Sequence, residues 1–101
     1  MDKEAVKLNE QAIELSSRGN YKEAIACFLG AIHIEKKNGL LWYNLGITYR
    51  DSGDLQAAKN ALFQAHKLDS DNVEILETLS LVCYAAEDLQ DAYVWAYEAL
   101  E

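Results

Sequence analysis

Hydrophobic residues recur every three or four positions along most of the chain, which is the spacing of side chains on one face of an α-helix. In the middle of the chain, the residues that carry this pattern are Trp42, Leu45, Gly46, Tyr49, Ala58, Leu62 and Ala65. The pattern is interrupted by Gly53, which suits the left-handed conformation that ends many helices. Asp54 follows, and its carboxylate can accept a hydrogen bond from the free N–H groups of a new helix. This stretch therefore predicts two helices joined by a tight turn.

The same pattern returns after 34 residues. Small residues align with small residues in three successive units: Ala12, Gly46 and Ser80; Ala24, Ala58 and Ala92; Ala31, Ala65 and Ala99. Such side chains let two antiparallel helices approach closely. One hairpin of this kind cannot cover its own apolar face, so neighbouring hairpins must stack. We therefore expect an all-α fold without strands, with helices near residues 4–17, 21–35, 39–51, 55–69, 73–86 and 89–100.

These residues resemble the tetratricopeptide repeat, whose pattern is W-x2-L-G-x2-Y, then A-x3-F-x2-A, then P. The middle unit matches this pattern best and has Leu62 at the position of the Phe. The first unit lacks the Trp, the third stops five residues short, and the closing proline is absent from all of them. The resemblance implies one domain, residues 1–101, built as an α-α superhelix (solenoid). Its three helix-turn-helix hairpins would span about residues 5–38, 39–72 and 73–101.

The negative charge of the chain indicates which kinds of partner it can bind. Its net charge of −8 argues against nucleic acid, because binding to phosphates needs a basic surface. Residues 73–101 contain seven carboxylates and no Lys or Arg, so a basic partner would be drawn to that end. A solvated acidic surface that aids solubility is the alternative.

Two further features bear on location. No apolar run reaches the length that spans a membrane, so we expect no membrane partner. Cys27 and Cys83 lack the spacing of a metal site or of a disulfide framework. We therefore expect two buried thiols in a reducing compartment, the cytoplasm.

By resemblance, the first helices of the repeats line a concave groove that holds a peptide or helix of another protein. The predicted contacts on this face are Tyr43, Asn44, Ile47, Arg50, Glu74, Glu77, Leu81 and Tyr84. The apolar and aromatic side chains among them would form the floor and walls, and the glutamates would steer a basic segment. We therefore expect an adaptor or scaffold module that binds a basic peptide with apolar anchors.

Alternative interpretations of these residues stay open. In a tight superhelix the apolar side chains of the groove partly cover one another. The Asn44 amide can bond within its own repeat instead of to a ligand. Arg50 can pair with Asp51 or Glu14 instead of with a partner.

One branch of the family binds the C-terminal carboxylate of chaperones through lysines, asparagines and an arginine. Asn44 occupies one of these asparagine positions, but Asn9 and Ile13 replace the lysine and the asparagine of the first repeat. Glu74 and Thr78 replace the basic pair of the third repeat, and a glutamate there would repel a carboxylate. We therefore expect no binding to a chaperone C-terminal tail.

No set of residues indicates catalysis, a cofactor or a bound metal. His33 and His66 fall near the ends of the predicted second helices, where a histidine interacts favourably with the helix dipole. Cys83 aligns with the buried Tyr of the repeat, so we expect it in the core. The sequence has no Gly-rich phosphate loop and no nucleophile with an adjacent base. We therefore expect a protein that is not an enzyme.

The last predicted helix is apolar on most of its circumference. Its outer stripe consists of Leu89, Tyr93, Ala96 and Leu100. Terminal repeats need a polar outer face to stay soluble, so we expect this stripe to be an interface, either in a homodimer or with further chain. A structural or oligomerisation module is therefore the alternative to a peptide-binding adaptor.

Overall fold

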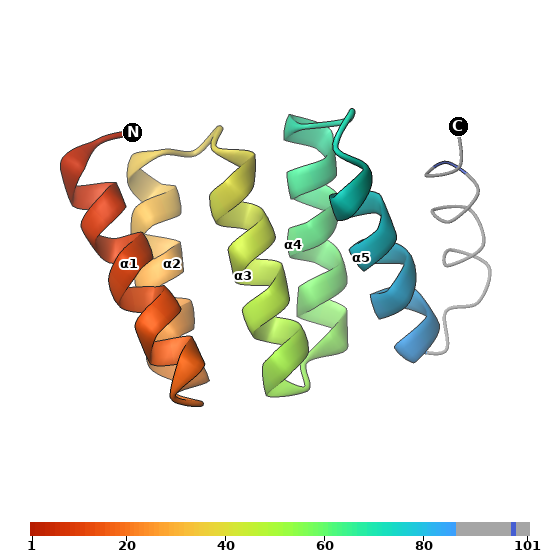
Figure 1. The fold of residues 1–101 in the computed structure, drawn as a ribbon, viewed down its shortest axis with the longest axis horizontal. Helices are drawn as coiled ribbons and strands as arrows, with labels where there is room; N and C mark the ends of the chain where they lie inside the picture. Colours follow the sequence, from red (N-terminus) through yellow and green to blue (C-terminus); the bar gives the residue numbers. More distant parts are fainter. Residues whose placement is uncertain (87–97, 99–101) are drawn as a thin grey trace.

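The computed structural model describes residues 1–86 and residue 98. They form five α-helices, shown in Figure 1: α1 (Lys3–Ser17), α2 (Tyr21–Ile34), α3 (Gly39–Ser52), α4 (Leu55–Leu68) and α5 (Val73–Ala85). The described residues contain no strand, and none of their helices is long and apolar enough to cross a membrane. Apart from residue 98, the predicted helix at 89–100 lies outside the described residues, as does the predicted interface of Leu89, Tyr93, Ala96 and Leu100.

The helix boundaries follow from capping chemistry and lie within one residue of the predicted ones. The Asp54 carboxylate accepts a hydrogen bond from the Ala57 backbone N–H at 3.1 Å and so caps α4, as predicted. Asn38 and Asn72 cap α3 and α5 in the same way. Gly53 has a φ of 94°, the left-handed conformation that closes α3 at little cost for a residue without Cβ.

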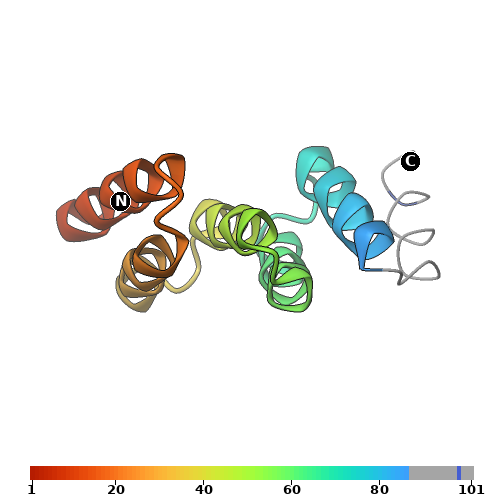
Figure 2. The ribbon, with the colours of Figure 1, turned by 90° about the horizontal axis from the view of Figure 1, so that it is seen from below.

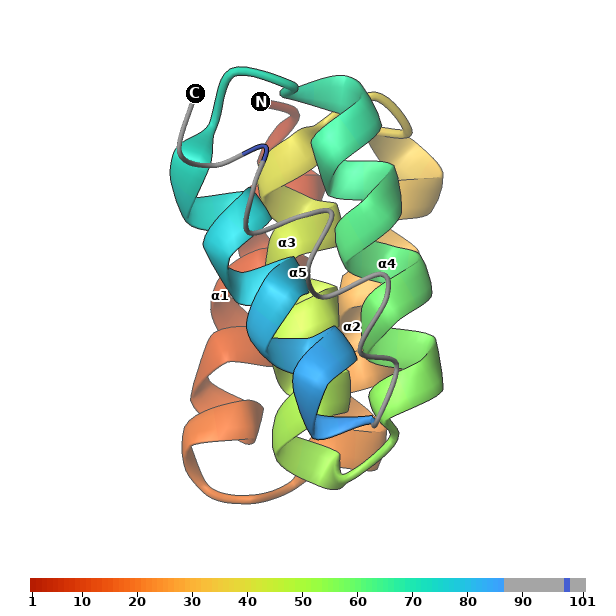
Figure 3. The ribbon, with the colours of Figure 1, turned by 90° about the vertical axis from the view of Figure 1, so that its right-hand side faces the viewer.

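The helices form antiparallel pairs that stack along one direction. Helix α1 packs on α2 and α3 packs on α4, while α2–α3 and α4–α5 contacts join one hairpin to the next. As a result, α1, α3 and α5 lie in one row, and α2 and α4 lie in the other (Figures 2 and 3). Helices of the first row therefore share a face that the second row does not cover.

The core lies between the hairpins. Phe28 and Ile32 of α2 are 1% and 6% exposed and belong to one cluster with Leu41 and Leu45 of α3. The second cluster repeats this arrangement one unit further and joins α4 to α5; its buried members are Ala58, Leu62, Leu79, Val82 and Cys83. Burial of this apolar area is the main favourable term that holds neighbouring hairpins together. The expectations that neighbouring hairpins stack and that Cys83 lies in the core are confirmed.

Helix α1 differs from α3 and α5 on the side that corresponds to their contact with a preceding hairpin. Leu41 and Leu45 of α3 are buried there, whereas the equivalent residues of α1 are Lys7 and Gln11, and both are exposed. One turn later Glu14 forms an ion pair with Arg18 at 2.6 Å. This side of α1 is therefore compatible with water.

Gly46 sets the closest approach of two helices. A Cβ atom placed on it would lie 2.7 Å from Cγ of Leu62 and 3.4 Å from the Ala58 carbonyl oxygen of α4. Leu62 is fully buried, so its branch point has no space into which to move. The close packing predicted from the small residue at this position is therefore present.

We expect Gly46→Ala to lower the free energy of unfolding by about 1–2 kcal/mol, because the clash outweighs the gain in helix propensity. Gly30→Ala is the matched control: it also lies within a helix, but an added Cβ would meet only the tip of Leu8, at 3.3 Å. We expect this variant to be as stable as the parent or more stable. Urea denaturation followed by circular dichroism measures both, and equal stability of the two variants would contradict the packing described here.

Candidate functional site

The face formed by α1, α3 and α5 carries large apolar side chains that contact water; we refer to it as the groove face. The most exposed are Ile13, Leu40, Leu81 and Tyr84, with exposed fractions of 49%, 54%, 66% and 68%. In Figure 2, α3 lies between α1 and α5 and is set back from them. The predicted contact residues of α3 and α5 thus belong to neighbouring helices of one row. Two hollows, described next, indent this face.

The first hollow lies between α1 and α3 and has a volume of about 360 Å³. Its lining combines an apolar floor with hydroxyl, amide and carboxylate groups: Ile13, Ser16, Ser17, Phe28, Asn44, Ile47, Thr48 and Asp51. Phe28 is the buried core residue of α2, so the hollow reaches the edge of the core. We call it the α1–α3 hollow. Its size and lining suit one apolar side chain whose backbone can meet polar groups at the rim.

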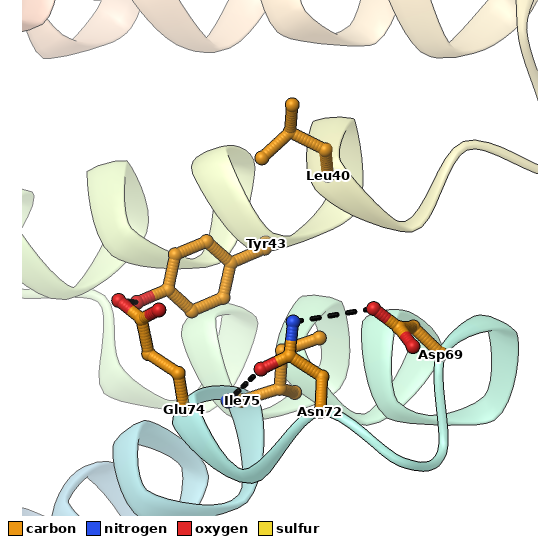
Figure 4. A pocket seen from close by; sticks show the side chains of 6 residues that line it. All are labelled: Leu40, Tyr43, Asp69, Asn72, Glu74 and Ile75. Atoms are coloured by element: carbon orange, nitrogen blue, oxygen red, sulfur yellow. Dashed lines mark hydrogen bonds between the residues drawn. The ribbon is translucent and has the colours of Figure 1, made fainter.

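The second hollow lies between α3 and the start of α5 and has a volume of about 190 Å³. Figure 4 shows its lining, which is Leu40, Tyr43, Asp69, Asn72, Glu74 and Ile75. Two carboxylates, a phenol and an amide therefore surround an aliphatic wall, and the lining includes no Lys or Arg. We call it the α3–α5 hollow. A cation with an aliphatic stem matches this combination of groups.

Polar side chains tie the first-row helices to one another across the groove face. The Tyr43 hydroxyl donates a hydrogen bond to Glu74 Oε1 at 3.2 Å and lies 3.4 Å from the Thr78 hydroxyl. Between α1 and α3, Asn44 Nδ2 donates to Asn9 Oδ1 at 3.2 Å. Asn44 thus bonds to the preceding hairpin and not within its own. These two bridges fix the spacing of the helices that carry the hollows.

The other predicted contacts lie outside the hollows. Arg50 pairs with Asp51 at 3.1 Å, as one of the open interpretations expected, and both side chains are about 40% exposed. An exposed pair of this kind contributes little to stability. Arg50, Glu77, Leu81 and Tyr84 line neither hollow.

The predicted contacts did not include the two residues that the turn before α5 contributes to the α3–α5 hollow. Asp69 and Asn72 belong to the turn between α4 and α5, and Asn72 Nδ2 donates to Asp69 Oδ2 at 3.2 Å (Figure 4). The prediction considered only helix residues, so it did not extend to this turn. The available signal was the position of Asn72 directly before α5, where its side chain caps the helix that carries Glu74.

We expect Tyr43→Phe to lower the free energy of unfolding by about 0.5–1.5 kcal/mol, because it removes the hydroxyl that bridges α3 and α5. Tyr84→Phe on α5 is the control, since its ring is 68% exposed and outside both hollows; we expect a change within about 0.5 kcal/mol. Urea denaturation measures both variants. If the Tyr43 variant were as stable as the Tyr84 variant, the bridge would have no role in joining the helices.

The comparisons with known proteins agree with this geometry. The model described as tetratricopeptide repeat matches residues 9–73 and again residues 43–101. A search of curated proteins found no match. Among solved structures, the first TPR of Spaghetti (RPAP3) bound to the HSP90 peptide SRMEEVD has a TM-score of 0.90 at 20% identity, over 99% of this chain and 79% of that one.

Two further structures have the same architecture. The Sgt2 TPR domain from Aspergillus fumigatus has a TM-score of 0.90 at 21% identity, over 97% of this chain and 65% of that one. The translocator chaperone SycD of type III secretion in Yersinia enterocolitica has a TM-score of 0.89 at 14% identity, over 98% and 75% of the two chains. At these identities the likeness concerns the fold. Because the family model covers more than half of the sequence, the chain belongs to the tetratricopeptide repeat family and has its all-α superhelical fold.

Proposed function

We propose that the chain is a protein-interaction module whose groove face binds a peptide segment of a partner protein. The observation that carries this proposal is the pair of hollows on one face, one with an apolar floor and one rich in carboxylates. Bridges from Asn44 and Tyr43 hold the three helices that form them. A site on rigid helices loses little conformational freedom on binding, which favours affinity.

Apolar anchors are supported by the exposed side chains of the groove face. Leu40, Leu81 and Tyr84 are all more than half exposed. Covering such side chains removes apolar surface from water, which contributes roughly 25 cal/mol of favourable free energy per Å² buried. We therefore expect a ligand with aliphatic or aromatic residues along this face.

A positive charge on the ligand is supported by the carboxylates. Asp69 and Glu74 line the α3–α5 hollow, and Glu77 follows on the exposed side of α5. No Lys or Arg occurs in the sequence after Lys67. This arrangement attracts a basic segment, and the attraction weakens as salt screens it.

We propose binding without catalysis and a cytoplasmic location. His33 and His66 lie in the last turns of α2 and α4, where a histidine interacts favourably with the helix dipole. Cys83 is fully buried and Cys27 half-buried, and neither forms a disulfide. In the described part of the chain, no cluster of His, Cys, Asp or Glu could hold a metal ion. We take residues 1–101 as one functional domain with repeats at about 5–38, 39–72 and 73–101.

A peptide selection tests this proposal. Random peptides displayed on phage are selected against the folded chain, and the selected peptides are synthesised and titrated by calorimetry. We expect the selected peptides to be basic with apolar anchors and to bind more weakly as the salt concentration rises. We expect their affinity for the Leu40→Ser variant to be about tenfold or more lower than for the parent, since an apolar contact is replaced by a polar one.

Leu29→Ser is the matched control for this experiment. Leu29 is 45% exposed, close to the 54% of Leu40, but it lies on α2 in the other row of helices. We expect the Leu29→Ser variant to bind the selected peptides with the same affinity as the parent. Selected peptides that are acidic, or that respond to the Leu29 variant and not to the Leu40 variant, would contradict groove binding.

We expect no saturable binding of the peptide SRMEEVD, which is bound by the first TPR of Spaghetti. In this chain Glu74 lies on the groove face, where it would repel the acidic peptide and its terminal carboxylate. Fluorescence anisotropy of the labelled peptide measures this. A dissociation constant in the micromolar range would contradict the expected charge preference.

A further inference from the structure

The two hollows lie on opposite sides of α3 and toward opposite ends of it. The α1–α3 hollow uses the second half of α3, from Asn44 to Asp51, together with the end of α1 at Ser16 and Ser17. The α3–α5 hollow uses the start of α3, at Leu40 and Tyr43, and the turn that leads into α5. A single ligand that fills both hollows must therefore cross α3 diagonally.

The helix geometry gives the length of this crossing. The two sets of α3 residues are centred about six residues apart, which corresponds to about 9 Å along a helix that rises 1.5 Å per residue. The hollows flank α3 on either side, so they are also separated sideways by about the spacing of neighbouring first-row helices. These helices make few direct contacts with one another, so we take this spacing as roughly 10 Å, the upper end of the range for packed helices. The diagonal is then about 13 Å. An extended chain covers this distance with about four residues at 3.3–3.4 Å each.

The alternation of side chains in an extended segment agrees with this number. Successive side chains point to opposite faces, so residues four positions apart share a face, whereas residues three or five apart do not. A spacing of four therefore satisfies both the distance and the requirement that both anchors point toward the protein.

The groups of the α3–α5 hollow indicate which anchor it takes. Glu74 Oε1 accepts from Tyr43 and Asp69 Oδ2 accepts from Asn72, while Glu74 Oε2 and Asp69 Oδ1 accept no hydrogen bond from any described residue. These two oxygens can accept from an ammonium or guanidinium group. Leu40 is 54% exposed and offers an apolar surface for the aliphatic stem of the same side chain.

Resting on the groove binding proposed above, we propose that the partner is an extended segment with one aliphatic residue and one Lys or Arg four positions apart. The aliphatic residue occupies the α1–α3 hollow against Ile13 and Ile47, and the cation occupies the α3–α5 hollow beside Glu74 and Asp69. The backbone between them passes over Tyr43 and Asn44. Glu77 and Leu81 contribute general attraction but do not set the spacing.

Synthetic peptides with controlled spacing test this inference. Each is a capped chain of Ser and Gly with one Leu and one Arg, at every separation from adjacent residues to about eight positions and in both orders. Amide shifts of the ¹⁵N-labelled chain give dissociation constants. We expect tightest binding at a separation of four, roughly two- to fivefold tighter than at three or five.

Other outcomes separate this inference from the proposed function. If groove amides of α3 and α5 shift for all peptides but affinity does not depend on spacing, the two-anchor inference is wrong and groove binding stands. An optimum at seven or eight positions would indicate a helical ligand and would likewise overturn the extended segment. If no peptide shifts the groove amides, both proposals fail.

Charge variants on one helix test the role of the cation. Glu74→Gln keeps an acceptor for the Tyr43 hydroxyl but removes the charge inside the hollow, and Glu77→Gln removes the same charge outside it. We expect Glu74→Gln to abolish the preference for a separation of four and Glu77→Gln to retain it. For the peptide with citrulline in place of Arg, we expect weak binding that neither variant changes. Equal effects of both variants on the Arg peptide would show attraction by net charge alone and would overturn the subsite.

Discussion

A pair of helices cannot bury its own apolar face, and this constraint governs the whole molecule. Phe28 and Ile32 of α2 are shielded from water because α3 of the next hairpin covers them. The contact repeats one unit further, where α5 covers Leu62. Each hairpin is therefore stable only with its neighbour, and the free energy of folding is distributed over the interfaces between hairpins.

This pattern of contacts between hairpins leaves one face of the first-row helices uncovered. Because α2 and α4 supply the stripes that the next hairpin covers, α1 and α3 need apolar contacts on only part of their surface. On the groove face, the first-row helices are joined by polar bridges, from Asn44 to Asn9 and from Tyr43 to Glu74. These bonds take the place of apolar burial on the groove face, and they leave space for the two hollows beside α3.

Charge is arranged along the stack as well as across it. Helix α1 presents Lys7, Gln11 and an Arg18–Glu14 ion pair on its outward side, whereas α5 and the turn before it contribute mainly carboxylates. In the proposed binding mode, a basic segment is therefore attracted toward the α5 end. The direction that we propose for the ligand across α3 follows from the same asymmetry, since the α3–α5 hollow is lined by two carboxylates and the α1–α3 hollow by one.

Local chemistry determined most of the fold. The three- and four-residue period defined the helices, Gly53 and Asp54 defined a turn, and small residues such as Gly46 located the close contact between helices. Each of these signals acts within a few residues or repeats with a constant period, so it can be followed along one sequence.

The groove face was predicted less completely, because it depends on distances between hairpins. Sequence alone placed Tyr43 and Asn44 on this face, but only the stacking brought them within hydrogen-bonding distance of Glu74 and Asn9. Asp69 entered the site for the same reason, as the turn before α5 comes to lie beside α3. A helical period specifies which way a side chain points from its own axis, whereas the packing of whole hairpins decides what it meets there.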